Sequence, residues 1–550
     1  MENLNTPLDM LYQWEQQTPD KLYLRQPVAG QWKEFTWKQA ANEVRTMAAA
    51  LQSYGLPAGS KIALVSKNCA HWLISDMAIM MAGYVSVPVY PNVNAETLGY
   101  VLKHSEAKIL LVGKLDDWNF MKAGVPSDVQ CISFPWYGPK QDGFHYWEDL
   151  VKQHQPLTGS PVRALDEVMT IIYTSGTTGN PKGVVHTFGS FAWASTLGKE
   201  ILGFKDSEER LFSYLPLSHI AERMLIAMVG LYTGSEIWFA ESLDLFAKNL
   251  AEARPTAFLG VPRIWTKFQM GVLGKLPQSR LNILLAIPII NNIIRKKIKA
   301  GLGLDQCKHY FTGSAPISPS LVNWWAKLGV ELEEVYSMTE NCAVSHANRK
   351  PDFKLGTQGK PMRGVEVRFS EQGEILVKVP SMMQGYYKEP ELTAATLKDG
   401  WLSTGDKGVL DEDGFLKITG RVKEIFKTNK GKYVAPAPIE GKISKNYLVE
   451  QICVSGASLP QPIGLVVLSA DAKTKDRAYI KESLAKTLEL VNPELEKHER
   501  IQKLIVTKED WTIENGLLTP TMKIKRTPIE SKYSPNYESW YAQSETVVFE

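Results

Sequence analysis

Two kinds of apolar pattern alternate along the first third of the chain. Short, unbroken runs of β-branched and aliphatic residues, such as KIALVSKN from Lys61 and VSVPVY from Val85, are typical of buried strands. Between them lie longer stretches typical of helices. This alternation favours a parallel α/β sheet with right-handed crossovers. The elements predicted here are helices over 7–17, 38–54, 69–83 and 95–104, a hairpin around Gly30, and strands at KIALVSKN, VSVPVY and AKILLVG.

The same alternation resumes after residue 168 and predicts a second α/β unit. A strand over 168–173 runs into a polar loop, and a helix over 188–202 follows. Beyond it the pattern predicts a strand over 214–219 that runs into a loop, a helix over 220–232, and strands over 235–239 and 257–262.

The pattern changes to short strands separated by many turns between residues 356 and 420. The runs VEVRF, EILVKV, GWLSTGD and GFLKITG predict a small β-barrel or an antiparallel sheet. A last α/β portion follows, with the strand PIGLVVLS and a charged helix over 475–490. Because 550 residues exceed a single hydrophobic core, we expect two or more domains.

Composition narrows the class of protein. The chain is 44% hydrophobic and 22% charged, as in ordinary globular proteins, and its net charge of +3 argues against a nucleic-acid partner. Its five cysteines are scattered and form no CxxC pair, which argues against a zinc site and favours a reduced, cytoplasmic compartment. The first twenty residues lack the pattern of a secretory signal.

Two apolar stretches raise the question of a membrane. The stretch over 71–90 is interrupted by Asp76, Gly83 and Pro88, which favours a buried helix followed by a strand. The stretch over 281–300 is too short and broken to span a bilayer but ends in a basic cluster. It predicts either a core or surface helix with a solvated end, or a segment that lies on an anionic membrane surface.

The polar loop at 174–183 is built to meet a ligand. Its sequence, TSGTTGNPKG, combines glycines that allow close approach with hydroxyl donors and the charge of Lys182, a combination that suits a polyphosphate. The spacing is neither the Walker pattern nor GxGxxG. The residues concerned are Thr174, Ser175, Gly176, Thr177, Thr178, Gly179, Lys182 and Gly183.

TSGTTGNPKG resembles, residue for residue, the phosphate loop of the adenylate-forming superfamily, which includes acyl-CoA synthetases, luciferases and peptide-synthetase adenylation domains. Further family motifs follow in the family's order. They are TGSAP (312–316), VYSMTE (335–340), STGD (403–406), GRVKE (420–424) and NGLLTPTMKIKR (515–526). In VYSMTE, Ser337 replaces the family's usual glycine.

The resemblance implies a role for each motif. Gly313, Ser314 and Ala315 would form the adenine-binding turn, Tyr336 would stack on adenine, and Thr339 would contact the α-phosphate. Glu340, with Thr178, would bind Mg²⁺; Asp406 would accept both ribose hydroxyls, and Arg421 would hold the ribose or a phosphate. Lys523 aligns with the family's mobile catalytic lysine, with Lys525 as a nearby competitor, and Lys182 would balance charge on the phosphates. His219, in PLSHIAER, would line the acyl pocket or serve a structural role, and His186 is expected to be structural.

The resemblance also implies the architecture. It predicts an α/β protein with a large N-terminal AMP-binding domain over 1–421, built from two α/β subdomains and a small β-barrel at 356–420. A hinge at 422–424, with Lys423 as the pivot, would lead to a small mobile α+β C-terminal domain over 425–550.

LPLSHIAER, GVPRIW, GKYVAPAPIE and GLLTPTMKIKR look like the long-chain fatty acyl-CoA synthetase branch. This implies ATP, Mg²⁺ and coenzyme A as cofactors and a fatty acid as substrate, activated in two half-reactions. Two other readings stay open: acyl carrier protein as the acceptor, and a binding protein that senses acyl-adenylate without turnover. A homodimer and a peripheral membrane contact are also left open, and the segment over 263–303 looks short for the family.

Overall fold

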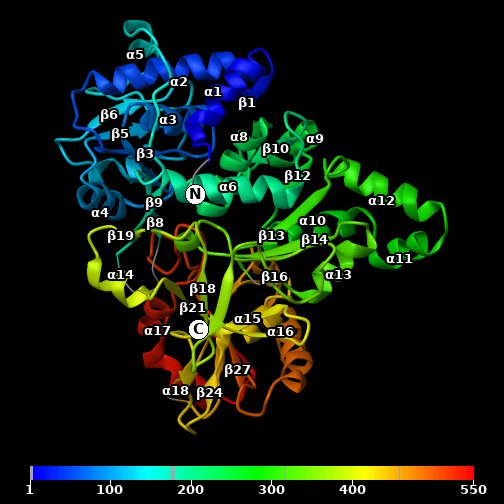
Figure 1. Ribbon diagram of the computed structural model, residues 1–550. Helices are drawn as coiled ribbons and strands as arrows, with labels where there is room; N and C mark the ends of the chain where they lie inside the picture. The colour runs from blue at the N-terminus through cyan, green and yellow to red at the C-terminus, as the bar shows by residue number, and fades with distance from the viewer. Residues whose placement is uncertain (1–3, 175–179, 316, 458) are drawn as a thin grey trace.

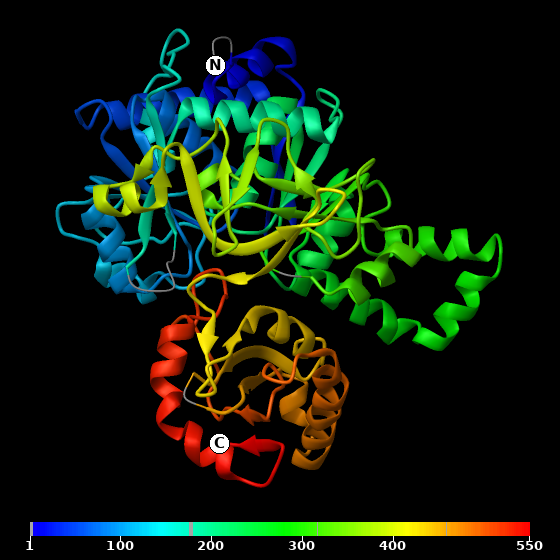
Figure 2. The same cartoon turned by 60° about the horizontal axis from the view of Figure 1, so that its bottom comes forward.

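The chain forms a large body and a smaller lobe that meet along one side (Figure 1). The computed structural model describes residues 4–174, 180–315, 317–457 and 459–550. Figure 2 shows the smaller lobe, in orange and red, beneath the body, and a pair of green helices that projects to one side.

An eight-stranded sheet forms the first half of the body. Its order is β19-β9-β8-β4-β3-β5-β6-β7, and the strands from β8 to β7 run parallel, as the alternating pattern predicted. At the other edge β9 and β19 pair antiparallel, so the sheet is mixed. The strands are β3 (Lys61–Val65), β4 (Val85–Val89), β5 (Ile109–Val112), β6 (Gln130–Ser133), β7 (His145–Tyr146), β8 (Val168–Thr174), β9 (Lys182–Thr187) and β19 (Gly385–Tyr386).

A nine-stranded sheet forms the second half. Its order is β16-β15-β14-β13-β12-β10-β11-β1-β2, and the run from β14 to β1 is parallel. Parallel strands end at the same edge of a sheet, so the residues that follow β10, β13 and β14 are gathered there. The strands are β1 (Leu22–Val28), β2 (Gln31–Thr36), β10 (Arg210–Ser213), β11 (Glu236–Phe239), β12 (Ala257–Leu259), β13 (His309–Gly313), β14 (Leu332–Tyr336), β15 (His346–Asn348) and β16 (Lys360–Pro361).

Helices cover both sheets, and several have the predicted limits. The helices α1 (Pro7–Gln17) and α6 (Phe188–Leu202) match the prediction residue for residue, because Thr6 and Thr187 cap their first turns. The other helices around the sheets are α2 (Trp37–Gln52), α3 (Ala70–Met81), α4 (Ala95–Ser105), α5 (Trp147–Gln153), α9 (Phe246–Ala253) and α13 (Pro319–Lys327). All twelve residues of α3 are buried, which confirms the buried helix expected in the stretch over 71–90.

The segment over 214–233 differs from its prediction. The strand there ends at Ser213, before the predicted start, because the backbone N–H of Tyr214 turns to the carboxylate of Glu222 instead of a neighbouring strand. The predicted helix is built in three parts: α7 (Ile220–Glu222), a π-helical turn η3 (Arg223–Met228) and α8 (Val229–Thr233). The hydrogen bond to the buried side chain of Glu222 therefore determines where the strand of this segment ends.

A buried ion pair fastens that segment to the first sheet. The guanidinium of Arg223 donates to both carboxylate oxygens of Asp76 on α3, at 2.7 and 2.8 Å, and to the hydroxyl of Thr170 on β8. Ser86 donates to the same carboxylate at 2.6 Å. The side chains of the pair are 0% and 1% exposed, so each charge depends on the other for its solvation.

An antiparallel sheet follows over most of 366–421 and matches the second of the two predicted alternatives. Its strands are β17 (Glu366–Phe369), β18 (Glu374–Lys378), β20 (Leu397–Lys398), β21 (Trp401–Leu410) and β22 (Leu416–Arg421). The helix α14 (Pro390–Thr396) lies between β19 and β20. Not every short strand of this region belongs to the sheet, because β16 and β19 extend the two large sheets.

The smaller lobe begins with the two-stranded ribbon β23 (Phe426–Lys427) and β24 (Tyr433–Val434). A four-stranded sheet, β25 (Val449–Ser455), β26 (Ile463–Leu468), β27 (Lys503–Val506) and β28 (Val547–Phe549), separates two apolar clusters of its own. The lobe's helices are α15 (Pro436–Ile443), α16 (Arg477–Val491), α17 (Arg526–Tyr533) and α18 (Tyr537–Ala542). The body's last strand ends at Arg421, and the predicted limits 1–421, 422–424 and 425–550 stay predictions.

The projecting pair of helices occupies the apolar stretch expected over 281–300. After α10 (Pro262–Lys275), the chain forms α11 (Gln278–Ala286) and α12 (Ile290–Gly301). The stretch is two helices because Pro288 and the left-handed backbone of Ile289, with φ 73°, turn the chain between them. Among the described residues, no helix is both long and apolar enough to cross a membrane.

We predict that Arg223→Met destabilises the protein by about 3–5 kcal/mol, because it leaves the carboxylate of Asp76 buried without its counter-charge. Equilibrium unfolding in urea measures the change. The matched control is Lys481→Met, which removes the exposed partner of Glu545 and should cost less than about 1 kcal/mol. Equal effects of the two substitutions would contradict the importance of the buried pair.

Candidate active site

The predicted phosphate loop joins two neighbouring strands. Its described ends are Thr174, the last residue of β8, and Lys182, the first of β9, which are paired in register. The hydroxyl of Thr174 donates to the carbonyl of Lys182 at 3.5 Å. The predicted ligands Ser175, Gly176, Thr177, Thr178 and Gly179 lie outside the described residues.

The phosphate-binding roles that the sequence predicts for these five residues therefore stay predictions.

A cluster of three side chains forms at the edge where the antiparallel sheet meets the nine-stranded sheet. Asp406 on β21 lies directly opposite Arg421 on β22, and the Arg421 Nε lies 2.9 Å from the Asp406 Oδ1. The hydroxyl of Tyr336, at the end of β14, donates to the other carboxylate oxygen at 2.8 Å. Asp406 is 7% exposed, while half of the Arg421 side chain remains open to solvent. The structure thus brings together three residues that the sequence predicted for one site.

A second carboxylate lies nearby, in the short helix η4 (Thr339–Asn341). The hydroxyl of Tyr386 donates to Glu340 Oε1 at 2.8 Å, and Lys182 Nζ lies 5.6 Å from the centre of the Tyr386 ring. Burial raises the pKa of the Glu340 carboxyl, while the bond from Tyr386 and the charges of Arg421 and Lys182 oppose that shift. Glu340 is therefore held close to two cations.

The predicted adenine turn follows β13 and lies beside Tyr336. Gly313 pairs with Val335, and a Cβ atom at this position would lie 2.8 Å from the Val335 carbonyl oxygen, so only glycine fits. Ser314 has a left-handed φ of 64°, and both it and Ala315 are exposed. The turn thus offers backbone and small side chains next to an aromatic ring.

Thr339 and His186 are linked across the site. Nε2 of His186 lies 2.7 Å from the Thr339 carbonyl oxygen, and Nδ1 lies 3.2 Å from the hydroxyl of Ser190. Burial lowers the pKa of His186 to about 4. A neutral, buried histidine with a hydrogen-bond partner at each ring nitrogen agrees with the structural role expected of His186, and it fixes the start of η4.

Lys523 reaches this cluster from the smaller lobe. It lies in a tight turn closed by Thr519 N–H to Lys523 O at 2.8 Å and by Lys523 N–H to Thr519 Oγ1 at 3.1 Å. Asn92 of the body donates to the Pro520 carbonyl of the same turn at 2.9 Å. Part of the side chain is exposed, but crowding by the protein, followed by the charge of Arg421, lowers the pKa of its ammonium group. The charges of Arg421 and Asp406 thus act on the ammonium group of Lys523.

His219 stands at the start of α7, where its Nδ1 accepts the backbone N–H of Ala221 at 3.2 Å. Burial, and then the charge of Lys523, lowers its pKa to about 4, so the ring is neutral at pH 7. The structure therefore gives His219 a capping role and places it near Lys523. Its predicted contact with an acyl group stays a prediction, as does the pivot at Lys423.

Two contributors had no signal in the sequence motifs. Tyr386, which holds Glu340, belongs to β19 and reaches the site only because that strand pairs with β9. Asn92, which holds the Lys523 turn, lies 428 residues away from its partner along the chain. Neither lies within a motif, so only the long-range pairing of the folded chain identifies them.

The assembled site has a definite chemical character. Arg421 forms an ion pair with Asp406, the charges of Arg421 and Lys182 act on Glu340, and the charges of Arg421 and Asp406 act on Lys523. An excess of positive charge next to a glycine-rich loop favours a polyanion, and a carboxylate in the same place can hold its counter-ion. The turn at Gly313 and the ring of Tyr336 leave an aromatic surface beside it.

Comparison with known proteins agrees with this geometry. Residues 11–387 match the family model of AMP-binding enzymes, and residues 424–545 match the model of the AMP-binding enzyme C-terminal domain. The long-chain-fatty-acid–CoA ligase FadD15 of Mycobacterium tuberculosis is 29% identical, over 97% of this chain and 96% of its own. The long-chain-fatty-acid–CoA ligase ACSBG2 of Gallus gallus is 27% identical, over 94% and 78%.

Solved structures share the fold. The anthranilate CoA ligase AuaEII, in complex with anthranoyl-AMP, superposes with a TM-score of 0.79 at 20% identity, over 98% of this chain and 99% of its own. The o-succinylbenzoate CoA synthetase MenE of Bacillus subtilis, in complex with the intermediate OSB-AMP, gives 0.74 at 22%, over 96% and 98%. The family match covers more than half of the chain and continues into the smaller lobe. The chain belongs to the AMP-binding enzyme family.

Proposed function

We propose that this protein is an AMP-forming ligase that activates a long-chain fatty acid with ATP and transfers the acyl group to coenzyme A. The observation that carries the proposal is the meeting of Lys523, from the smaller lobe, with the cluster of Asp406, Arg421 and Tyr336 in the body. The names of the relatives that match along nearly the full chain support the long-chain acid and coenzyme A.

In the first half-reaction, a carboxylate oxygen of the acid attacks the α-phosphorus of ATP and pyrophosphate leaves. Both reactants are anions, so cations must hold them together and stabilise the charge that develops on the phosphate oxygens. We assign this task to Lys523 at the carboxylate and α-phosphate, and to Lys182 at the outer phosphates. Asp406 accepts from the ribose hydroxyls while Tyr336 and Arg421 hold its carboxylate in place.

We assign Mg²⁺ to Glu340. The residues fit this ion, because Mg²⁺ in nucleotide sites takes one or two carboxylates and completes its shell with phosphate oxygens and water. Tyr386 orients one oxygen of Glu340, and Lys182 lies close by. The bound ion would neutralise phosphate charge. Thr178, the other predicted ligand, lies outside the described residues.

In the second half-reaction the thiol of coenzyme A attacks the acyl carbonyl of the adenylate and releases AMP. Lys523 has no role at that carbon, so we propose that the smaller lobe turns about Lys423 and withdraws it. Two polar contacts join the lobe to the body near this path: Asn92 with Pro520, and Arg263 with Glu450, at 3.3 Å between Nη1 and Oε1. The first is a single, partly buried hydrogen bond and the second is an exposed ion pair, so we expect both to break at each turnover.

Incubation with ATP, Mg²⁺ and fatty acids of graded length, with and without coenzyme A, tests the proposal directly. We expect pyrophosphate release that depends on the acid, and acyl-CoA and AMP only when coenzyme A is present. Long acids should be favoured, because each methylene buried adds about 0.8 kcal/mol. Formation of an acyl thioester with acyl carrier protein, and none with coenzyme A, would identify the carrier protein as the acceptor. Binding of acyl-adenylate without turnover would overturn the proposal.

We predict that Lys523→Ala slows adenylation, measured as exchange of pyrophosphate into ATP, by about 10²–10³-fold, as expected for a lost electrostatic contact to the transition state. Thioester formation from supplied acyl-adenylate should change little. Lys525→Ala is the matched control two residues away and should leave both steps unchanged. An equal loss in both half-reactions would mean that Lys523 acts on the fold of the lobe instead.

We predict that Asp406→Asn raises the KM for ATP by about 10–100-fold, since a charged hydrogen-bond acceptor contributes about 1.5–3 kcal/mol. Tyr336→Phe keeps the ring but removes the hydroxyl that donates to Asp406, so its effect on the KM should be smaller. Initial-rate kinetics at saturating fatty acid measure both. A larger effect of Tyr336→Phe would assign the binding energy to the hydroxyl and not to the carboxylate.

A further inference from the structure

The projecting pair α11 and α12, which we call the arm, exposes large apolar side chains at its tip. Ile283, Ile289 and Ile293 are 63%, 77% and 58% exposed, and Ile287 between the helices is 39% exposed. Only Leu281 of α11, and no residue of α12, is fully buried. Four isoleucines gathered at one turn form a continuous apolar tip rather than scattered exposed residues.

The arm and the helix α10 that leads into it carry charged side chains of positive sign only over residues 264–304. Residues 264–304 contain seven lysines and arginines and no aspartate or glutamate, although the whole chain has a net charge of only +3. The basic residues are Lys267, Lys275, Arg280, Arg295, Lys296, Lys297 and Lys299. None of these seven forms an ion pair with any residue that the structure describes. The rest of the chain is therefore net negative, and positive charge is concentrated here.

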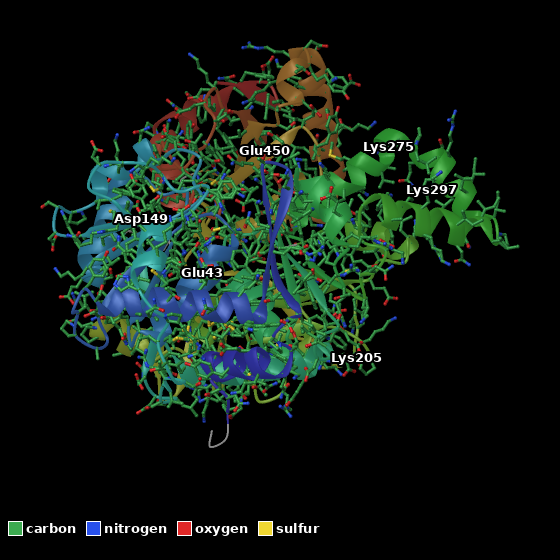
Figure 3. The ribbon with its side chains drawn as sticks, turned by 90° about the horizontal axis from the view of Figure 1, so that it is seen from above. Glu43, Asp149, Lys205, Lys275, Lys297 and Glu450 are labelled. Atoms are coloured by element: carbon green, nitrogen blue, oxygen red, sulfur yellow. The ribbon has the colours of Figure 1, made fainter. Side chains whose placement is uncertain are left out.

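The arm is anchored on one side and free on the other. Leu285, Ile294 and Ile298 pack against the apolar cluster around α10 and α13, and Trp324 donates to Gln278 Oε1 at 2.8 Å. Arg280 and Ile283 lie three residues apart in α11, and Ile293 and Lys297 lie four residues apart in α12, so each pair shares one face of its helix. Ile287 and Ile289 lie in the turn between the two helices. Figure 3 labels Lys297 on the arm and Lys275 at the end of α10, where the chain leads into the arm.

We propose that the arm docks the protein on an anionic lipid surface, with the isoleucine tip inserted among the acyl chains and the basic residues at the headgroups. The combination favours a membrane over other partners. A nucleic acid would use the charges but leave the isoleucines exposed to water, and a helix with both features is typical of interfacial binding. The apolar tip is adjacent in sequence to Lys296 and Lys297, which are exposed, whereas Arg295 donates to the Lys327 carbonyl at 2.9 Å and belongs to the anchored side.

This inference is independent of the proposed reaction, because vesicle binding is measured without ATP, acid or coenzyme A. The protein is mixed with vesicles of phosphatidylcholine alone or with added phosphatidylglycerol and separated by flotation. We expect binding to the anionic vesicles that weakens as the salt concentration rises. The circular dichroism spectrum of each variant is compared with that of the parent protein to check that the variant is folded.

Two arm variants and two matched variants elsewhere locate the contact. Ile289→Ser with Ile293→Ser removes the tip, and Lys296→Gln with Lys297→Gln removes charge. Each should weaken binding to anionic vesicles by about tenfold or more, given the expected contributions of buried methylenes and of surface cations. The controls, Leu243→Ser with Leu490→Ser and Lys33→Gln with Lys38→Gln, alter exposed residues away from the arm and should bind as the parent does.

Three results would overturn the proposal. Equal effects of arm and control variants would show that the arm is not the contact. Loss with the lysine variant alone, and none with the isoleucine variant, would indicate a polyanion that does not take up the tip. A lower oligomer mass in light scattering for the isoleucine variant, without loss of vesicle binding, would make the arm a contact between two copies of this chain.

Discussion

The carboxylate of Asp406 is the point on which separately built parts of the chain depend. It is positioned by strand pairing with Arg421, it accepts a hydrogen bond from Tyr336 of the nine-stranded sheet, and its charge acts on Lys523 of the smaller lobe. Each of these neighbours lies at the end of a strand or in a tight turn, where little else fixes its side chain. A single buried acid thus contacts residues of two sheets, and its charge acts on a lysine of the lobe.

The balance of charge around that acid explains why the site needs a ligand. Three cations face two carboxylates, and crowding lowers the pKa of Lys523 while it raises that of Glu340. Burial is the largest cause of both shifts, so each charged group lacks part of the solvation that it has in water. In the proposed reaction, a triphosphate would supply negative charge to Lys523, and a bound Mg²⁺ would supply positive charge to Glu340. A partly buried hydrogen bond and an exposed ion pair join the lobe that carries Lys523 to the body, which agrees with the proposed movement of the lobe.

Features that depend on neighbours along the chain could be predicted from the sequence, whereas features that depend on distant partners could not. Helices α1 and α6 had the predicted limits because their capping residues are local, and the motifs around Asp406, Arg421 and Tyr336 came together as the resemblance implied. The strand expected over 214–219 was wrong, because the distant partners of Glu222 and Arg223 decide the backbone there. Tyr386 and Asn92 could not be predicted for the same reason, since each depends on a pairing across the fold.

The arm shows the opposite case, in which the sequence pattern was clear but its meaning depended on the fold. An apolar stretch with a basic end is compatible with a core helix as well as with a membrane contact. The turn at Pro288 and Ile289 divides the stretch into two short helices that bury only one side against the body, so the stretch is not a core helix, while the membrane contact remains our proposal. In α12, Ile294 and Ile298 occupy that side and Ile293 faces outward, while Ile289 is exposed in the turn that precedes the helix. The exposure of these isoleucines follows from the anchoring of the opposite side, and the proposed membrane contact would cover them.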